Sequence, residues 1–397
     1  MVHTQPAEGF VHPFSPAARQ APYPAFSWLR DNAPLFLDSY SGMYYVTDHA
    51  SVAQILRDQR FSAALGQRDR DQSLPPVMLN TDPPEHQRLR APGRLLLGPA
   101  AIARHLAQIA DETERLLDGL AARTEAEVTV DLGPPFATIV LAAVLRIPPP
   151  ERSAFAALAR QASVNLDPLA GQAAARAGRQ AAGLLTRYLD GNTDRALAAD
   201  ADTSTGTGSP LADLARDGRL SRGEMLGILT LTVIGGFEPL ACLVGNALAW
   251  LLPRPAAMAA LRAADQGAAE RAVDELLRLE SPIPFVSRVS TEPVALPCGN
   301  VPAGARVLAV LAAANRDPAV FSRPDDLVLD RTPNPHLAFG GGGHFCLAGP
   351  LVRSCAAVLL ARLVRRFPGL RAVPGERPEW ADSLIPRRVR ALPVTLG

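Results

Sequence analysis

Cys346 and its neighbours are the part of the chain with the clearest capacity for chemistry, in the segment AFGGGGHFCLAGP of residues 338–350. Four successive glycines exceed what a surface turn needs, because each loses backbone entropy on folding. Taken alone, the cysteine could be a buried small residue, a nucleophile paired with a histidine, or a zinc ligand lacking two partners nearby. It could also be the axial thiolate of a haem iron, with glycines that let the backbone approach the porphyrin. The helical pattern after it would place the sulfur at a helix N-terminus, which favours negative charge.

The segment resembles the haem-binding signature of the cytochromes P450. The matching residues are Phe339, Gly340, Gly342, His344, Cys346 and Ala348. Arg353, seven residues after the cysteine, also stands where that family has an arginine. The resemblance implies that Cys346 is catalytic and is the metal ligand, a thiolate on the iron of haem b. The neighbours that it implies for the cofactor are Phe339, Gly340, His344 and Ala348.

Further matches to the same family occur in the expected order along the chain. Glu275 and Arg278 in ELLR are three residues apart on one helix face, where they can pair. The resemblance implies that Arg331 completes this buried structural network. ANRDP at residues 314–318 is another match, and together the motifs cover about residues 80–360.

Four basic or imidazole side chains are candidates for binding the haem propionates. His86 and Arg90 are four residues apart in DPPEHQRLR, and Arg288 follows Arg278 by ten residues. By the same resemblance, His344 is the fourth member. Convergence of cationic donors on two carboxylates is what burial of a dianionic ring requires.

The run Gly235-Gly236-Phe237-Glu238-Pro239 departs from the family pattern. The resemblance implies that Gly235, Glu238 and position 239 lie at the catalytic centre, where relatives use an acid and a threonine to organise water for proton delivery. Proline supplies no hydroxyl, and it removes the N–H that would bond the Gly235 carbonyl, which predicts a kink. Our hypothesis is that protons come through Glu238, a water at that carbonyl or a substrate hydroxyl.

We therefore expect a monooxygenase that oxidises a hydrophobic or aromatic small molecule, as a tailoring step in bacterial natural-product biosynthesis. The alternatives are coupling, cyclisation or desaturation without net oxygen insertion, a haem protein without turnover, and a helical protein without haem. The resemblance implies a substrate pocket that includes Val233, Phe237, Phe285, Val286 and Leu384.

The resemblance also implies dioxygen as co-substrate and NAD(P)H-derived electrons, delivered by a ferredoxin and a ferredoxin reductase. We expect the acidic ferredoxin to meet a basic patch on the thiolate side, where complementary charge would raise the association rate. The arginines predicted for this patch are Arg88, Arg94, Arg362, Arg365 and Arg366.

The composition fits a cytoplasmic protein. The net charge of +1 favours neither nucleic acid nor an anionic membrane, and four cysteines without a CxxC pair indicate a reducing compartment. No secretory signal is evident at the N-terminus. The apolar segment Met225–Leu252 is long enough to span a bilayer, but a carboxylate and a proline at its centre favour a buried helix. We expect a monomer.

The elements that must position these residues are mostly helical. Periodicity predicts helices near Ser15–Asn32, His49–Asp58, Pro99–Thr124 and Gln266–Glu280, with a hairpin at Leu35–Asp48 and short strands after residue 286. We expect one domain over residues 1–397, mainly α with minor β. The resemblance implies the cytochrome P450 fold, a helix-rich triangular prism with small β-sheets. The segments expected to be flexible are residues 1–14 and about 199–210, and residues 61–79 are expected to form a long loop.

Overall fold

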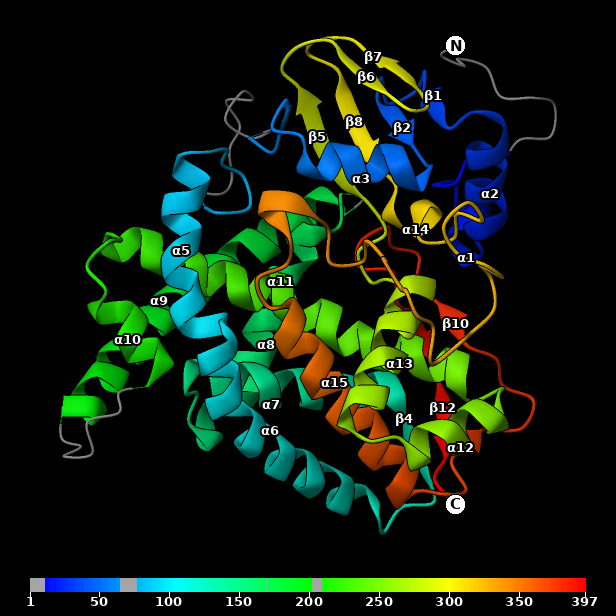
Figure 1. The fold of residues 1–397 in the computed structure, drawn as a ribbon. Helices are drawn as coiled ribbons and strands as arrows, with labels where there is room; N and C mark the ends of the chain where they lie inside the picture. The colour runs from blue at the N-terminus through cyan, green and yellow to red at the C-terminus, as the bar shows by residue number, and fades with distance from the viewer. Residues whose placement is uncertain (1–10, 65–76, 169, 202–208) are drawn as a thin grey trace.

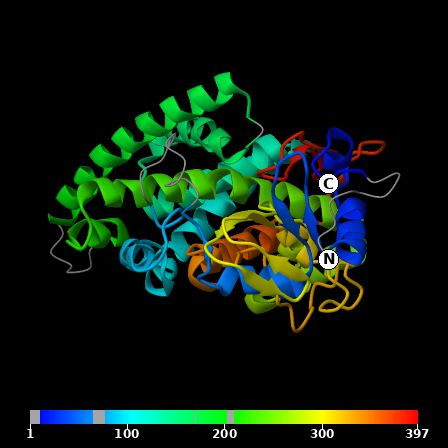
Figure 2. The same ribbon diagram turned by 90° about the horizontal axis from the view of Figure 1, so that it is seen from above.

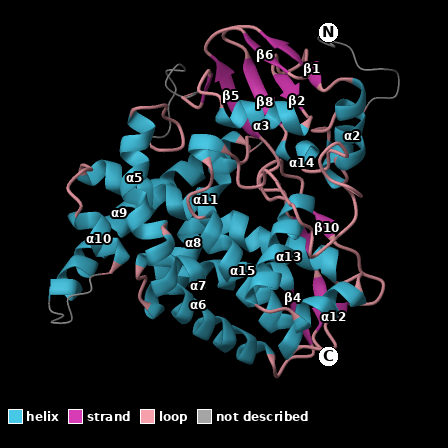
Figure 3. Cartoon of the chain, viewed as in Figure 1, coloured by secondary structure: helices cyan, strands magenta, loops and turns pink. Residues whose placement is uncertain are grey.

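The computed structural model describes residues 11–64, 77–168, 170–201 and 209–397. Helices dominate the fold, and small sheets lie at its edges (Figure 3). The longer helices are α2 (Tyr23–Asn32), α3 (His49–Arg57), α5 (Glu85–Leu97), α6 (Pro99–Leu120), α7 (Gly133–Leu145), α8 (Arg152–Ser163), α9 (Gln172–Ala201), α11 (Arg222–Leu251), α13 (Gln266–Leu279) and α15 (Gly349–Arg366). The shorter ones are α1 (Pro16–Gln20), α10 (Pro210–Arg216), α12 (Pro255–Ala263), α14 (Leu311–Ala314) and the single turns η1 (Val128–Leu132), η2 (Pro149–Glu151), η3 (Val164–Leu166) and η4 (Gly342–His344).

Helix α11 is the centre of the main hydrophobic core and packs against α7, α8, α9 and α13 (Figure 1). It crosses the molecule as one long helix (Figure 2). A capping box formed by Ser221 and Glu224 starts it. Two segments of the described chain are long and apolar enough to cross a membrane, Val128–Leu145 and Arg222–Leu251, but 67% and 61% of their apolar windows are buried inside the protein. Both therefore serve here as core helices.

A five-stranded sheet lies beside α3, in the order β1-β2-β8-β5-β3. The predicted hairpin is confirmed, since β1 and β2 are antiparallel, while β8 joins β2 in parallel. Its strands are β1 (Leu35–Leu37), β2 (Tyr44–Val46), β8 (Arg306–Ala309), β5 (Val286–Ser290) and β3 (Phe61–Ser62). The remaining strands are β4 (Glu125–Glu127), β12 (Pro393–Thr395) and β9 (Arg371–Ala372), the pair β6 (Val294–Leu296) and β7 (Gly299–Val301), and the pair β10 (Glu379–Trp380) and β11 (Val389–Ala391).

The prediction of a mainly helical chain with minor β structure is confirmed, with local differences. The helix expected near Ser15–Asn32 is two helices, because Pro22 stands between α1 and α2 and proline suits only the first turn of a helix. Three alanines after Leu311 form α14 instead of continuing β8, in keeping with their high helix propensity.

The segments expected to be flexible or irregular lie partly outside the described residues. Residues 1–10, 65–76 and 202–208 are in this class. Within the described part, the ring of Phe14 lies 5.0 Å from that of Phe285. Aromatic packing therefore contacts the C-terminal end of this segment at Phe14, and its flexibility stays a prediction.

Candidate functional site

The thiol of Cys346 sits at the N-terminus of α15, as predicted. The Cys346 N–H donates to the carbonyl of Phe339 at 2.8 Å, which closes the preceding loop. Burial raises the pKa of the thiol, while hydrogen bonds from the backbone N–H groups of Ala348 and Gly349 and the charge of Arg90 act in the opposite direction. Those groups would stabilise a thiolate, so the loop is built to hold a negative sulfur.

The glycine run before the cysteine is needed for reasons internal to the protein. Gly340 and Gly342 have φ of +72° and +60°, a region that side chains disfavour. A Cβ on Gly342 would also collide with the carbonyl of Leu56 at the end of α3. The prediction that these glycines make room for a porphyrin is corrected at Gly342, where the close neighbour is α3.

His86, Arg90, Arg288 and His344 meet at one cavity of about 470 Å³, although they come from α5, β5 and η4. The rings of His86 and His344 lie 4.0 Å apart between centroids. Burial and the charge of Arg90 lower the pKa of His86, and burial together with Arg288 and His86 lowers the pKa of His344 to about 4. We call these four residues the cationic cradle.

The carboxylates among the described lining residues of this cavity, Asp58 and Asp82, are engaged with residues outside the cradle. His86 Nε2 is buried without a hydrogen-bond partner among the described residues, and burial lowers the pKa of the Arg288 guanidinium. The nearby carboxylate of Asp82 accepts hydrogen bonds from the Ser62 hydroxyl and from the Ala63 N–H at 2.9 Å. Buried positive charge without partners is costly, so the residues fit a dianionic group such as the propionates of haem.

The predicted network of Glu275, Arg278 and Arg331 is present and buried. Arg278 Nε lies 2.7 Å and Arg331 Nε 2.9 Å from Glu275 Oε2, and the side chains of Glu275 and Arg278 are fully buried. Arg278 also donates to the carbonyls of Asn315 and Pro324. The network therefore ties α13 to the segment that leads to Cys346, which is a structural role.

Two further residues of this region were not identified from the sequence. Asn315, within the ANRDP motif, accepts a hydrogen bond from the Leu337 N–H at 2.7 Å and so anchors the start of the cysteine loop. Asp274 lies 2.7 Å from Arg353 Nε and 3.2 Å from His336 Nε2. The sequence shows that Arg353 matches the family pattern, but it does not show that Asp274 is the partner of Arg353. The only local indication of Asp274 is that it precedes Glu275 of the predicted network.

One face of α11 is open where the cofactor is expected. Leu231, Gly235 and Pro239, at four-residue spacing, are partly or fully exposed, and α11 runs through Pro239 without interruption, so the expected kink does not break the helix. Val233 and Phe237 are fully buried in the main core. They lie about 200° around the helix from the open face at ~100° per residue, and their contact with a substrate stays a prediction.

The other predicted pocket residues lie near the N-terminal segment. Phe285 is buried, and its cluster includes Phe14 and Leu384 at its edge. Val286 is half-buried at the start of β5. Their contact with a substrate stays a prediction.

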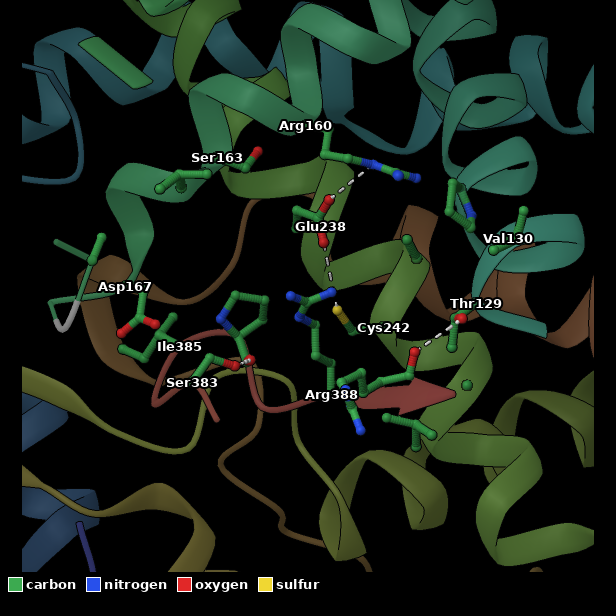
Figure 4. Close-up of a pocket in the computed structure, with 18 of the residues that line it drawn as sticks. Thr129, Val130, Arg160, Ser163, Asp167, Glu238, Cys242, Ser383, Ile385 and Arg388 are labelled. Atoms are coloured by element: carbon green, nitrogen blue, oxygen red, sulfur yellow. Dashed lines mark hydrogen bonds and ion pairs between the residues drawn. The ribbon is translucent and has the colours of Figure 1, made fainter. Parts of the chain in front are cut away.

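Glu238 is turned toward a second cavity (Figure 4). Its Oε1 lies 3.7 Å from Arg160 Nε, and its Oε2 lies 4.0 Å from the Cys242 sulfur. Burial raises the pKa of the Glu238 carboxyl, and the charges of Arg388 and Arg160 oppose that shift. No local sequence pattern connects these two arginines with Glu238, so sequence reasoning did not find them.

The predicted basic patch is largely neutralised by ion pairs. Arg88 pairs with Glu85 and Glu224. Arg362 and Arg366 pair with Glu114 and Asp118, and Arg365 donates to the backbone carbonyls of Arg262 and Ala264. Three of the five arginines are therefore paired with carboxylates, and the role of the patch in docking a ferredoxin stays a prediction. Arg94 remains exposed at the edge of the cradle cavity.

Known proteins resemble this chain over almost its whole length. The family model for Cytochrome P450 matches residues 211–380. Nocardicin C N-oxygenase of Nocardia uniformis subsp. tsuyamanensis is 32% identical, covering 97% of this chain and 98% of that protein. Cytochrome P450 monooxygenase PikC of Streptomyces venezuelae is 31% identical over 94% of this chain and 90% of that one. The solved structure of P450BioI in complex with a hexadec-9Z-enoic acid ligated acyl carrier protein superposes with a TM-score of 0.86, at 27% identity, covering 95% of this chain and 99% of that one.

Replacing Glu275 by Gln should strongly destabilise the fold. Arg278 and Arg331 would keep their buried charge without a carboxylate, at a cost of about 3–5 kcal/mol in the free energy of unfolding. Denaturant unfolding measures this. Glu379→Gln is the matched control, because Glu379 pairs with Arg390 at an exposed site, with side chains 56% and 68% exposed. Similar losses in both variants would contradict a central role for Glu275.

Proposed function

Because the chain belongs to the cytochrome P450 family, we propose that it is a haem-thiolate monooxygenase that oxidises a hydrophobic or aromatic small molecule in bacterial natural-product tailoring. Members of the family are oxidoreductases with haem b held by a cysteine thiolate, and redox partners supply their electrons. Relatives named for nocardicin C oxygenation and as PikC support the tailoring role. The observation that carries the proposal is that Cys346 and the cationic cradle lie within one region of the fold.

We propose that Cys346 is the iron ligand and that the cradle holds the propionates. Arg90 links the two, because its Nη2 donates to the carbonyl of Phe345 at 2.5 Å, next to the thiol. Haem, when bound, supplies the chemistry that activates dioxygen. The chain supplies the thiolate, the charges that bury the propionates, and Glu238 as an acid near the open face of α11. Because the pKa of Glu238 is raised, it keeps a proton to a higher pH than an ordinary glutamate does.

Cys346→Ser tests the assignment of the ligand. The purified protein reduced in the presence of carbon monoxide should lose the Soret band typical of thiolate ligation. Cys355→Ser is the matched control, because Cys355 is a fully buried cysteine of α15 away from the loop, and its band should persist. Retention of the thiolate spectrum in Cys346→Ser would refute the proposal.

Pro239 favours a second candidate, in which the enzyme couples, cyclises or desaturates its substrate without net oxygen insertion. Position 239 supplies neither a hydroxyl nor an N–H, and Glu238 contacts Arg160 on another side of α11. The absence of that hydroxyl is the property of the site on which this candidate rests. The two reactions differ in whether the product contains oxygen from ¹⁸O₂, which mass spectrometry detects.

Replacing Pro239 by Thr should raise the product formed per NAD(P)H consumed. The variant restores both the hydroxyl and the N–H, and the assay can use any hydrophobic compound that shifts the Soret band and is turned over. Pro239→Val is the control, because valine matches threonine in shape but lacks the hydroxyl. An unchanged yield in Pro239→Thr would show that the native site delivers protons without that hydroxyl.

We propose that the electron donor is a ferredoxin, served by its reductase, and that it docks beside Cys346. A Cβ on Gly93 would meet the Leu347 side chain at 2.9 Å, so Arg94 lies next to the cysteine loop, where Phe345 is 38% exposed. We propose that the protein is a cytoplasmic monomer. Its four cysteines, all in the described chain, are free thiols, as expected in a reducing compartment.

Arg94→Glu should slow reduction by ferredoxin several-fold in stopped-flow measurements, because it reverses one exposed charge at the docking face. Added salt should slow the native protein as well. Arg366→Gln is the control, since Asp118 already pairs with that arginine, and it should react at nearly the native rate. Equal rates for all three proteins at low salt would rule out this docking face.

A further inference from the structure

A second cavity, of about 540 Å³, opens beside Glu238 and has no part in the function proposed above (Figure 4). It lies between η1, the end of α8, α11 and the C-terminal loop before β11. We propose that this cavity binds the carboxylate of a small amphipathic organic acid through Arg388 and Arg160. We call it the arginine cavity.

The charges of the arginine cavity leave a place for an anion. Arg388 extends from the chain just before β11 toward Glu238 and Cys242 (Figure 4), and no carboxylate of the described residues lies within ion-pair distance of it. Arg160 Nε is 3.7 Å from Glu238 Oε1, which is too long for a good hydrogen bond. Two guanidinium groups therefore lie near one carboxylate that neither binds closely, and both retain donors for a second one.

The remaining charged groups of the lining do not cancel this excess beside Glu238. Arg390 pairs with Glu379, outside the cavity. Asp167 lines the cavity at the left of the view, whereas Arg388 is near its centre, and Asp167 has an interaction of its own (Figure 4). The Ser163 hydroxyl donates to the carbonyls of Ala159 and Ile234, so it does not take part.

The residues that line the arginine cavity indicate the character of the rest of the ligand. Between the polar groups, the lining is formed by apolar side chains and one glycine: Val130, Pro134, Val164, Ala241, Gly245, Ile385 and Val389. At Gly245 a Cβ would meet only ordinary contacts, 3.7 Å from Val389 Cβ, so the backbone of α11 is part of the wall. A cavity of this size and character suits a drug-sized ligand with an apolar body and few polar groups.

The arginine cavity and the cofactor side lie on different faces of α11. Glu238, Cys242 and Gly245 face the cavity, whereas Gly235 and Pro239 belong to the open face. A bound carboxylate would compete with Glu238 for the two arginines. Occupancy would therefore change the charge environment of the acid that serves the other side of the helix.

Calorimetric titration of the haem-loaded enzyme with decanoate tests the proposal, with methyl decanoate as the uncharged counterpart. Decanoate should bind and the ester should bind more weakly. Arg388→Gln should weaken decanoate binding about tenfold, the loss expected for one charge-assisted contact. Arg390→Gln, two residues away and already paired, should leave it unchanged. Glu238→Gln should tighten it, because the competing carboxylate is gone.

The proposal would be overturned if the acid and the ester bound equally well, or if Arg388→Gln and Arg390→Gln had equal effects. It would also be overturned by weaker binding in Glu238→Gln, or if none of decanoate, hexanoate and phenylacetate bound. The Soret band shows whether the bound acid is a substrate or an effector. If the acid shifts the band and the shift depends on Arg388, the cavity binds the carboxylate of the substrate. If the acid binds without shifting the band, the cavity binds a separate effector. The titration does not rely on turnover or thiolate ligation, so its failure is distinct from failure of the proposed function.

Discussion

A single buried carboxylate, that of Glu275, holds together the parts of the chain that form the candidate site. It accepts from Arg278 and Arg331, and from the Val328 N–H at 3.0 Å. Arg278 in turn fixes carbonyls of the segment after α14. A buried ion pair is often no better than an apolar packing of equal size, so its value here lies in geometry. The network sets the path of the irregular segment that leads to Cys346, because that segment has no regular backbone hydrogen bonding to define its path.

The same reasoning separates two kinds of buried charge in this protein. In the Glu275 network, donors and acceptors balance within the chain. In the cationic cradle they do not, because two arginines and two histidines meet at a cavity whose described lining has two carboxylates, Asp58 and Asp82, and both are engaged with residues outside the cradle. A fold tolerates such an imbalance when a ligand completes it. The imbalance supports the proposal that the cradle binds a dianion, and this support does not depend on the resemblance to other proteins.

Sequence reasoning succeeded where spacing alone determines which residues meet. Glu275 and Arg278 three apart, and His86 and Arg90 four apart, must share a helix face. The assignment of Val233 and Phe237 to the substrate pocket rests on analogy, and it stays a prediction for two residues that the structure places in the main core. For the basic patch, the sequence shows the charges but not their partners, such as Asp118, which is 248 residues from Arg366. Partners brought together by tertiary packing carry no local signal, and Arg388 beside Glu238 is the same case.

Helix α11 separates two environments, and its sequence explains how. A glycine at 235 keeps the cofactor side open, and a proline at 239 leaves the Gly235 carbonyl without its helical donor. The side chain of Glu238 points about 100° away from that of Pro239, the angle between successive residues of a helix. It lies near Arg160 of α8 and Arg388 of the C-terminal loop. A threonine at 239 would have placed a hydroxyl on the cofactor side. Without it, the nearest titratable group of this turn is Glu238, whose charge depends on what occupies the opposite side. In the proposed function, proton supply and the second cavity would therefore be linked through one carboxylate.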